Sequence, residues 1–311
     1  MAGNKAVVHA SVTRLGTLAA MFALLVTAAA CGTAGGSSSS SGKLAVVATE
    51  NFWGSILSQL GGDRVQVQSL IVSPDADPHE FDPTPADRAK LARAKYVIVN
   101  GAGYDPKVQS AVDATPVSGR QELVVANLIG VKEGGNPHMW YGPSYVRKVV
   151  DQMTEDLKKL DSADAGFFDE QHSTFLSQGL KQYDDLRAKI KQQYAGTPVG
   201  ATESIFVYLA DDLGLKLITP AEYMTAISEG SEPTAADKAT FDAQITNKQI
   251  KVLVFNTQNK TPDVDALVNK AKSRNIPVAS VTETLEPASA KFQDWQSKQL
   301  RDLLAALGSA R

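Results

Sequence analysis

Residues 44–72 read LAVVATENFWGSILSQLGGDRVQVQSLIV, and this stretch decides the fold class. Its first six residues, rich in valine and small residues, predict a strand, and VQVQSLIV at 65–72 predicts another. Between them, apolar residues from Phe52 to Leu60 recur at helical spacing, and Gly61 with Gly62 ends the helix. A strand, a helix and a second strand in this order are typical of an α/β fold with a parallel-rich sheet.

The same alternation continues and divides the chain into two lobes. The first lobe, at 43–142, continues with predicted helices at 85–94 and 105–113 and predicted strands at 96–101 and 122–127. The second lobe, at 196–311, contains predicted strands at 197–202, 215–219, 252–256 and 277–282. The residues between the lobes, 143–195, predict one long connector helix with a possible break at 161–164. The lobes share no internal sequence repeat, so any likeness between them is architectural.

The amino-terminal segment has the features of an export signal. Lys5 and Arg14 precede an apolar stretch that ends in small residues before Cys31, so residues 1–30 are predicted to be a signal peptide. The stretch is shorter than the roughly 20 residues of a membrane-spanning helix. The site around Cys31 resembles the lipobox of bacterial lipoproteins, although Ala28 stands where leucine is usual. We expect lipidation of Cys31, followed by a flexible Gly/Ser linker to residue 42; ordinary secretion with one spare thiol is the alternative.

Composition excludes several classes of protein. Removing residues 1–30 takes away two positive charges, Lys5 and Arg14, and no acid, so the formal net charge changes from −3 to −5. An acidic chain of this kind is not expected to bind nucleic acid. A single cysteine excludes disulfides within the chain. We expect a monomer in which the folded part does not cross the membrane.

Two short motifs place two of the four histidines beside prolines in loops. DPHEFDPTPAD at 77–87 contains His79, and NPHMW at 136–140 contains His138. Both loops follow predicted strands, and ligands of open α/β sheets bind at the carboxyl ends of strands. A preceding proline restricts the backbone and reduces the entropy that is lost when an imidazole is fixed on a cation. One loop histidine is usually a surface residue, but two in the same setting indicate a metal site.

These motifs, together with ATESIFVYLADDLGL at 201–215, resemble the substrate-binding proteins of bacterial ABC importers that carry zinc, manganese or iron. The resemblance implies that His79, His138 and Glu203 are metal ligands in a cleft between the lobes. The family usually offers an aspartate after the last strand as the fourth ligand, and this chain has none there. Glu283 is the expected replacement, with Glu286 as the alternative.

The resemblance also implies how the chain works. One divalent ion per chain would be carried as cargo to an ABC permease with a cytoplasmic ATPase, by a protein that is lipid-anchored on the outer face of the bacterial cell membrane. Imidazoles and carboxylates without a cysteine suit Zn²⁺ or Mn²⁺ and disfavour copper(I). The chain lacks the His-rich loop of many zinc-specific relatives, yet zinc exceeds manganese in intrinsic affinity, so both metals stay open. We expect affinity to fall as histidines become protonated near pH ~6.

Two other functions have to be weighed against carriage of a metal. A metal-dependent hydrolase would need a general base such as the Glu of H-E-x-x-H, and that motif is absent. A surface adhesin fits the export signal equally well but gives the two histidines no purpose. We therefore expect no enzymatic activity. His172 is expected on the surface and the aromatic residues Trp53, Trp140 and Tyr141 beside the site. Residues 229–233 are expected to form a solvated loop, with contact to the permease or the cleft rim as the alternative.

Overall fold

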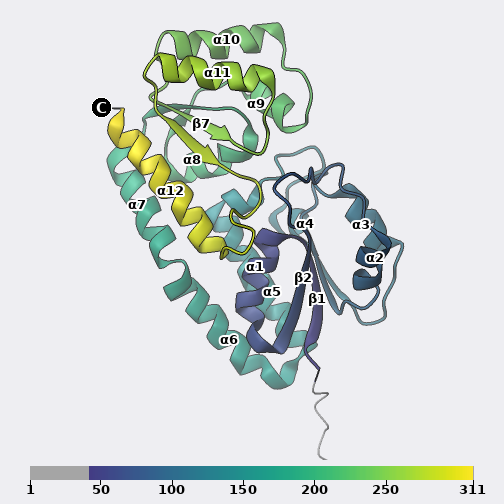
Figure 1. Cartoon of the computed structure of the whole chain (residues 1–311). Coiled ribbons are helices and arrows are strands. Elements are labelled where there is room, and N and C mark those ends of the chain that lie inside the picture. Colours follow the sequence, from purple (N-terminus) through teal and green to yellow (C-terminus); the bar gives the residue numbers. More distant parts are fainter. Residues whose placement is uncertain (1–41, 311) are drawn as a thin grey trace, which may run out of the picture. The chain divides into compact units, whose positions relative to one another are not determined.

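Two parallel β-sheets form the scaffold of the computed structural model, which describes residues 42–310 (Figure 1). The first sheet has the order β2-β1-β3-β4 and consists of β1 Leu44–Glu50, β2 Val65–Ile71, β3 Tyr96–Val99 and β4 Gln121–Val124. The second has the order β6-β5-β7-β8 and consists of β5 Pro198–Ala201, β6 Lys216–Leu217, β7 Val252–Asn256 and β8 Val278–Val281. All neighbouring strands are parallel. The predicted α/β class is confirmed, and the two sheets repeat one strand order without a repeated sequence.

The helices of the first lobe follow the predicted alternation. They are α1 Asn51–Gly61, α2 Pro85–Leu91, α3 Pro106–Asp113 and α4 Val125–Ile129. Helix α1 ends at Gly62, which has a positive φ of 51° that a residue with a side chain would adopt only with strain. Helix α2 begins with a capping box, in which Thr84 and Asp87 exchange hydrogen bonds. The strand expected at 122–127 ends early at Val124, because a short apolar run gives no periodicity that separates strand from buried helix.

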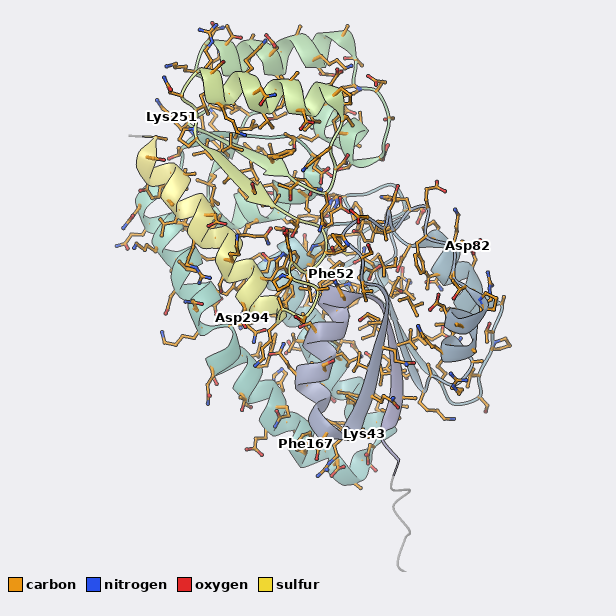
Figure 2. All side chains as sticks on the ribbon, in the orientation of Figure 1. Lys43, Phe52, Asp82, Phe167, Lys251 and Asp294 are labelled. Atoms are coloured by element: carbon orange, nitrogen blue, oxygen red, sulfur yellow. The ribbon has the colours of Figure 1, made fainter. Side chains whose placement is uncertain are left out.

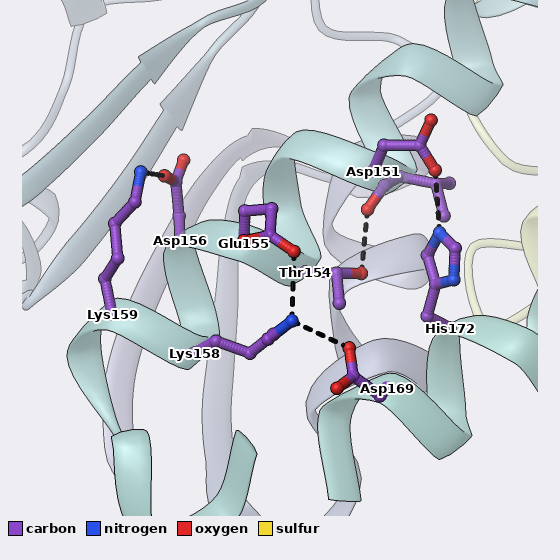
Figure 3. A network of polar contacts seen from close by, with 9 residues as sticks. Asp151, Thr154, Glu155, Asp156, Lys158, Lys159, Asp169 and His172 are labelled. Carbon is purple, nitrogen blue, oxygen red and sulfur yellow. Dashed lines mark hydrogen bonds and ion pairs between the residues drawn. The ribbon is translucent and has the colours of Figure 1, made fainter. Parts of the chain in front are cut away.

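The segment between the lobes is helical but consists of two arms. Helix α5 spans Pro143–Leu160, and after the 3-10 turn Ser162–Asp164 the chain continues as α6 Ala165–Thr174, a π-turn at Phe175–Gly179 and α7 Lys181–Tyr194. Helix α6 packs against α5, so the break predicted at 161–164 is a reversal rather than a slight irregularity. Figure 3 shows the contacts across it, including Lys158 with Asp169 at 2.9 Å.

His172 belongs to the same contact between α5 and α6. Its Nε2 lies 2.7 Å from Oδ1 of Asp151, and its side chain is about a quarter exposed (Figure 3). It therefore pairs with one carboxylate on the connector, and in the part of the chain that the structure describes it belongs to no group of three potential metal ligands.

Helices of the second lobe surround its sheet and reach back to the first lobe. They are α8 Val207–Leu213, α9 Ala221–Ser228, α10 Ala235–Thr246, α11 Pro262–Ser273 and α12 Phe292–Ser309. Helix α12 packs along α7 and also contacts α1 (Figure 1). At that contact the amides of Gln59 and Gln293 exchange hydrogen bonds of 3.1 and 2.7 Å. The last helix thus connects the second lobe with the first.

One large hydrophobic core contains buried side chains of both lobes, including Trp53, Trp140 and Trp295. Phe52 at the start of α1, labelled in Figure 2, stacks on Trp140 with ring centroids 4.1 Å apart. A smaller cluster lies on the other face of the first sheet and includes Val97 and Val108. Because the main core is continuous, residues 42–310 should resist bending between the lobes.

The predicted signal peptide, Cys31 and nearly all of the linker fall outside the described residues. None of the helices in the described range is both long and apolar enough to cross a membrane.

Candidate metal-binding site

The carboxyl ends of the strands bring the candidate ligands to one place. Glu203 lies two residues after β5, and Glu283 lies two residues after β8, on either side of β7 in the second sheet. His138 comes from the first lobe, immediately before the 3-10 turn Met139–Tyr141. Loops that follow parallel strands meet at the same edge of a sheet, which explains why residues far apart in the sequence converge.

Ligand atoms of His138, Glu203 and Glu283 lie within 4.8 Å of one another. Within residues 42–310 this is the only group of three or more His, Cys, Asp or Glu with such spacing. His138 is 3 % exposed and Glu203 1 % exposed. Four-coordinate zinc has metal–ligand distances of about 2.0 to 2.2 Å, which places its ligand atoms about 3.4 Å apart. A small inward shift of these three side chains would therefore suffice to hold one ion.

The imidazole of His138 is oriented by Asn136 of the same motif. Nδ1 of His138 lies 2.7 Å from Oδ1 of Asn136 and donates its hydrogen there. The Asn136 amide is itself fixed, because its Nδ2 donates to the backbone carbonyl of Ser204 at 2.8 Å. Nε2 of His138 is thus left as the unprotonated nitrogen that can bind a metal. Burial, reinforced by the positive charge of His79 when it is protonated, lowers the pKa of His138 to about 3. Its ring stays neutral near pH 6, contrary to our expectation.

Neutral donors hold the two carboxylates. Oε1 and Oε2 of Glu203 accept hydrogen bonds from Asn256 at 2.6 Å and Asn259 at 2.7 Å. Oε1 and Oε2 of Glu283 accept from Asn256 at 2.8 Å and from the Tyr104 hydroxyl at 2.9 Å. Burial raises the pKa of both glutamates, and repulsion from Glu283 raises that of Glu203 further. A divalent cation would oppose this rise in pKa, because it compensates both charges at once.

His79 lies at the rim of the site and outside the group of three. Its Nδ1 donates to the carbonyl of Gly103 at 2.9 Å, which leaves Nε2 free, as in His138. The ring of Tyr104 contacts both imidazoles edge-to-face, with centroid distances of 5.3 Å to His79 and 5.9 Å to His138. The structure therefore brings three of the four predicted ligands together and leaves His79 outside the group. Glu286, the alternative fourth ligand, is exposed and does not join them.

Two cavities lie at the rim of the site. One of about 320 Å³ is lined by His79, Asn136, Ser204 and Glu229 among others, and one of about 230 Å³ by His79, Glu229 and Glu283 among others. Glu229 belongs to the segment 229–233, which we expected to be a solvated loop, and it lines both cavities. His79 also lines both, so it stands where an ion would pass.

The predicted aromatic residues pack below the ligands. Trp140 contacts the His138 ring edge-to-face at 5.2 Å, and the Trp53 indole donates to Oδ1 of Asn100 at 3.1 Å. The Tyr141 hydroxyl donates to the carbonyl of Thr282 at 2.7 Å, one residue before Glu283. All three aromatic side chains are fully buried, so they exclude water from beneath the site and link the two lobes there.

Four residues of the site were not predicted from the sequence: Tyr104, Asn136, Asn256 and Asn259. Asn136 lies in the NPHMW motif itself and could have been predicted as the hydrogen-bond partner that orients the histidine. Asn256 ends the strand VLVFN, just as Asn100 follows the corresponding strand of the first lobe in YVIVN. Tyr104 and Asn259 carry no comparable signal, because only the fold places them beside a glutamate.

Known proteins similar to this chain bind transition metals. The model of the family described as "Zinc-uptake complex component A periplasmic" matches residues 46–306. The "High-affinity zinc uptake system protein ZnuA" of Bacillus subtilis (strain 168) is 26 % identical over 301 residues, which cover 89 % of each chain. The "Manganese ABC transporter substrate-binding lipoprotein PsaA" of Streptococcus anginosus is 25 % identical over 85 % of this chain and 88 % of its own.

Solved structures share the fold. The periplasmic zinc binding protein TroA from Treponema pallidum superimposes with a TM-score of 0.71 at 19 % identity, over 86 % of this chain and 99 % of its own. A Mn-bound S38A mutant of the periplasmic metal binding protein from candidatus liberibacter asiaticus gives a TM-score of 0.72 at 18 % identity, over 84 % and 98 %. At such identities the likeness concerns the two-lobed α/β architecture alone.

Proposed function

Because the chain belongs to the zinc-uptake complex component A family, whose members are solute-binding proteins of ABC transporters and not enzymes, we propose that it captures one Zn²⁺ or Mn²⁺ ion outside the cytoplasm. It then delivers this ion to the permease of an ABC importer. The observation that carries the proposal is the group of buried His138, buried Glu203 and half-buried Glu283, with ligand atoms within 4.8 Å of one another. A buried pair of carboxylates without a cationic partner is costly unless a cation compensates it.

The proposed ligand set is His79, His138, Glu203 and Glu283. Glu283 replaces the aspartate of the family, which is supported by its place two residues after the last strand and by its proximity to Glu203. His79 completes the set through a small movement of its loop, in which its contacts with the Gly103 carbonyl and the Tyr104 ring have to adapt. Capture would thus begin on three prearranged side chains, and the fourth would close over the ion from the rim.

The mechanism involves binding and release without a chemical step. His138 offers a neutral imidazole, while the glutamates, whose pKa values are raised, lose any bound proton and supply the negative charge that the ion compensates. Ligands come from both lobes, so the ion favours the state in which the lobes are together. Docking on the permease would draw the lobes apart and weaken the site, and the cytoplasmic ATPase would drive the cycle.

Cys31 would carry the lipid that keeps the protein at the outer face of the cell membrane. The small residues before it and the Gly/Ser segment after it support this assignment. A monomer on such a tether could bind an ion and still reach the permease. Cys31→Ser should release the protein into the soluble fraction, and continued membrane retention would contradict lipidation.

Metal content and affinity test the proposal directly. Protein purified without added metal should contain one equivalent of zinc or manganese by elemental analysis, and competition calorimetry should rank the two ions. Loss of a ligand typically weakens a metal site by about tenfold or more. His138→Ala should have the larger effect and His79→Ala the smaller, because His138 already belongs to the buried group.

The matched control is His172→Ala, since that imidazole faces Asp151 on the connector and should leave affinity unchanged. Absence of bound metal in the wild-type protein, or full affinity in both ligand variants, would overturn the proposal. Loss of metal uptake in a deletion strain, restored by excess metal, would distinguish an importer component from an adhesin.

A further inference from the structure

Asn256 occupies the position between the two acidic ligands. It is the last residue of β7, and β7 lies between β5 and β8, the strands after which Glu203 and Glu283 follow. Its side chain is buried, with 1 % of the residue exposed. Any residue at this strand end must therefore face both carboxylates.

The amide of Asn256 uses both of its hydrogens on these carboxylates. Nδ2 donates to Oε1 of Glu203 at 2.6 Å and to Oε1 of Glu283 at 2.8 Å. The assignment of nitrogen and oxygen in this amide is fixed, because Oδ1 accepts a hydrogen bond from the backbone N–H of Gln258 at 3.0 Å. One side chain thus ties together two groups that repel each other and fixes the distance between them.

The choice of a neutral donor matters for a divalent ion. A lysine or arginine here would neutralise the carboxylates and compete with the metal, whereas an aspartate would add a third negative charge. No lysine or arginine among residues 42–310 forms an ion pair or a recorded hydrogen bond with Glu203 or Glu283. The amide orders the ligands and leaves their full charge to the ion.

The first lobe uses an asparagine at the corresponding place. Asn100 directly follows β3, the strand that occupies in the first sheet the position of β7 in the second. Its Nδ2 donates to the carbonyl of Pro137 at 2.9 Å, and Pro137 precedes His138. Each lobe therefore supports its ligand loop with an asparagine from the end of its third strand.

We propose that Asn256 is a positioning residue that holds Glu203 and Glu283 side by side in fixed orientations and thereby favours zinc over manganese. Asn256 holds Oε1 of both glutamates, and Asn259 and Tyr104 hold the other oxygens, so each carboxylate is fixed in one orientation towards the ion. Tetrahedral zinc fits that arrangement. Released glutamates can turn and bind through both oxygens, which suits the higher coordination of manganese. This inference rests on the proposed function, because it takes both glutamates to be ligands.

Replacing the donor tests this role. Asn256→Ala should lower zinc affinity about tenfold or more, as for other residues that orient ligands, and should lower manganese affinity less, both measured by competition calorimetry. Bound Co²⁺ provides a second readout, because tetrahedral Co²⁺ absorbs visible light more strongly than five- or six-coordinate Co²⁺. The cobalt band should weaken in the variant. Asn256→Leu, which keeps the volume without a donor, serves the same purpose if the alanine variant fails to fold.

Two comparisons make the result specific. Asn259→Ala removes one hydrogen bond, to Glu203 alone, and should have a smaller effect. Asn269→Ala changes an exposed asparagine on α11 and should behave as wild type. An unchanged ratio of zinc to manganese affinity together with an unchanged cobalt spectrum would overturn the inference, even if thermal stability fell. If instead the wild-type protein bound neither zinc nor manganese, the proposed function itself would fail.

Discussion

At the scale of single residues, the site is a set of groups whose ionisation is controlled by burial. Within residues 42–310, neither Glu203 nor Glu283 forms an ion pair with a lysine or arginine, and burial raises the pKa of both. The pKa of His138 shifts in the opposite direction, because burial disfavours the charged form of the imidazole and so lowers its pKa. The metal-free site thus holds a neutral imidazole beside a carboxylate pair that retains a proton. Protonation of the pair, rather than of His138, should set how affinity depends on pH.

Metal affinity should therefore rise between pH 6 and pH 8. The ion binds ionised carboxylates, so below the raised pKa of the pair a proton leaves on binding, and affinity gains up to about tenfold per pH unit. Calorimetry in two buffers of different ionisation enthalpy measures both the affinity and the proton release. Constant affinity without proton release over this range would show that both glutamates are already ionised in the metal-free protein.

At the scale of elements, the end of β1 carries a second buried acid. Glu50 is fully buried, and neither of its carboxylate oxygens accepts a hydrogen bond from an N–H or O–H donor within the described residues. Its neighbour Asp105 accepts the backbone N–H groups of Asn100 at 2.9 Å and Gly101 at 2.8 Å. Burial first, and then the charge of Asp105, raise the pKa of Glu50. Glu50 should thus be protonated and donate to Asp105, which holds the loop after β3.

Replacing Glu50 with glutamine should make stability less dependent on pH. A carboxyl group whose pKa is raised in the folded state makes its full contribution to the free energy of unfolding below its unfolded-state pKa of about 4.3. Between that pKa and the folded-state pKa, the contribution decreases by about 1.4 kcal/mol per pH unit. Glutamine keeps a donor for Asp105 and has no proton to lose. The stability of Glu50→Gln relative to the wild type should therefore increase from pH 5 to pH 8. Urea unfolding at both values measures the difference, and parallel stabilities would contradict it.

Elements near one another in sequence were predictable, and contacts between elements were not. Alternating apolar runs separated by glycine and proline predicted both sheets, and the aspartates at 161–164 predicted the break after α5. The direction in which the chain turns there depends on packing of α6 against α5. The two histidine motifs predicted a metal site, yet the sequence could not show that only His138 joins the group of three, because that depends on how the loops of the two lobes pack. Asn256 likewise acts through side chains 53 and 27 residues away.

At the scale of the whole described chain, the two lobes share one core and one site. The hydroxyl of Tyr141 reaches Thr282, and the Tyr104 hydroxyl reaches Glu283, so hydrogen bonds join the lobes beside the ligands. Farther away, Gln59 of α1 and Gln293 of α12 join them again. The main hydrophobic cluster includes residues of both sheets. Large separation of the lobes would break these contacts together, so opening for release should be small.

Unfolding should accordingly be a single transition that bound metal shifts as a whole. A ligand that binds only the folded state stabilises it by about 2.7 kcal/mol at a free concentration 100 times its dissociation constant. Because the ion is bound by residues of both lobes, that stabilisation should reach the entire cooperative unit, and scanning calorimetry should show one peak that moves to higher temperature with zinc or manganese. In His138→Ala the shift should shrink, while His172→Ala should retain it. Two separate peaks, with only one sensitive to metal, would mean that the lobes unfold independently and that the ion is held by one of them alone.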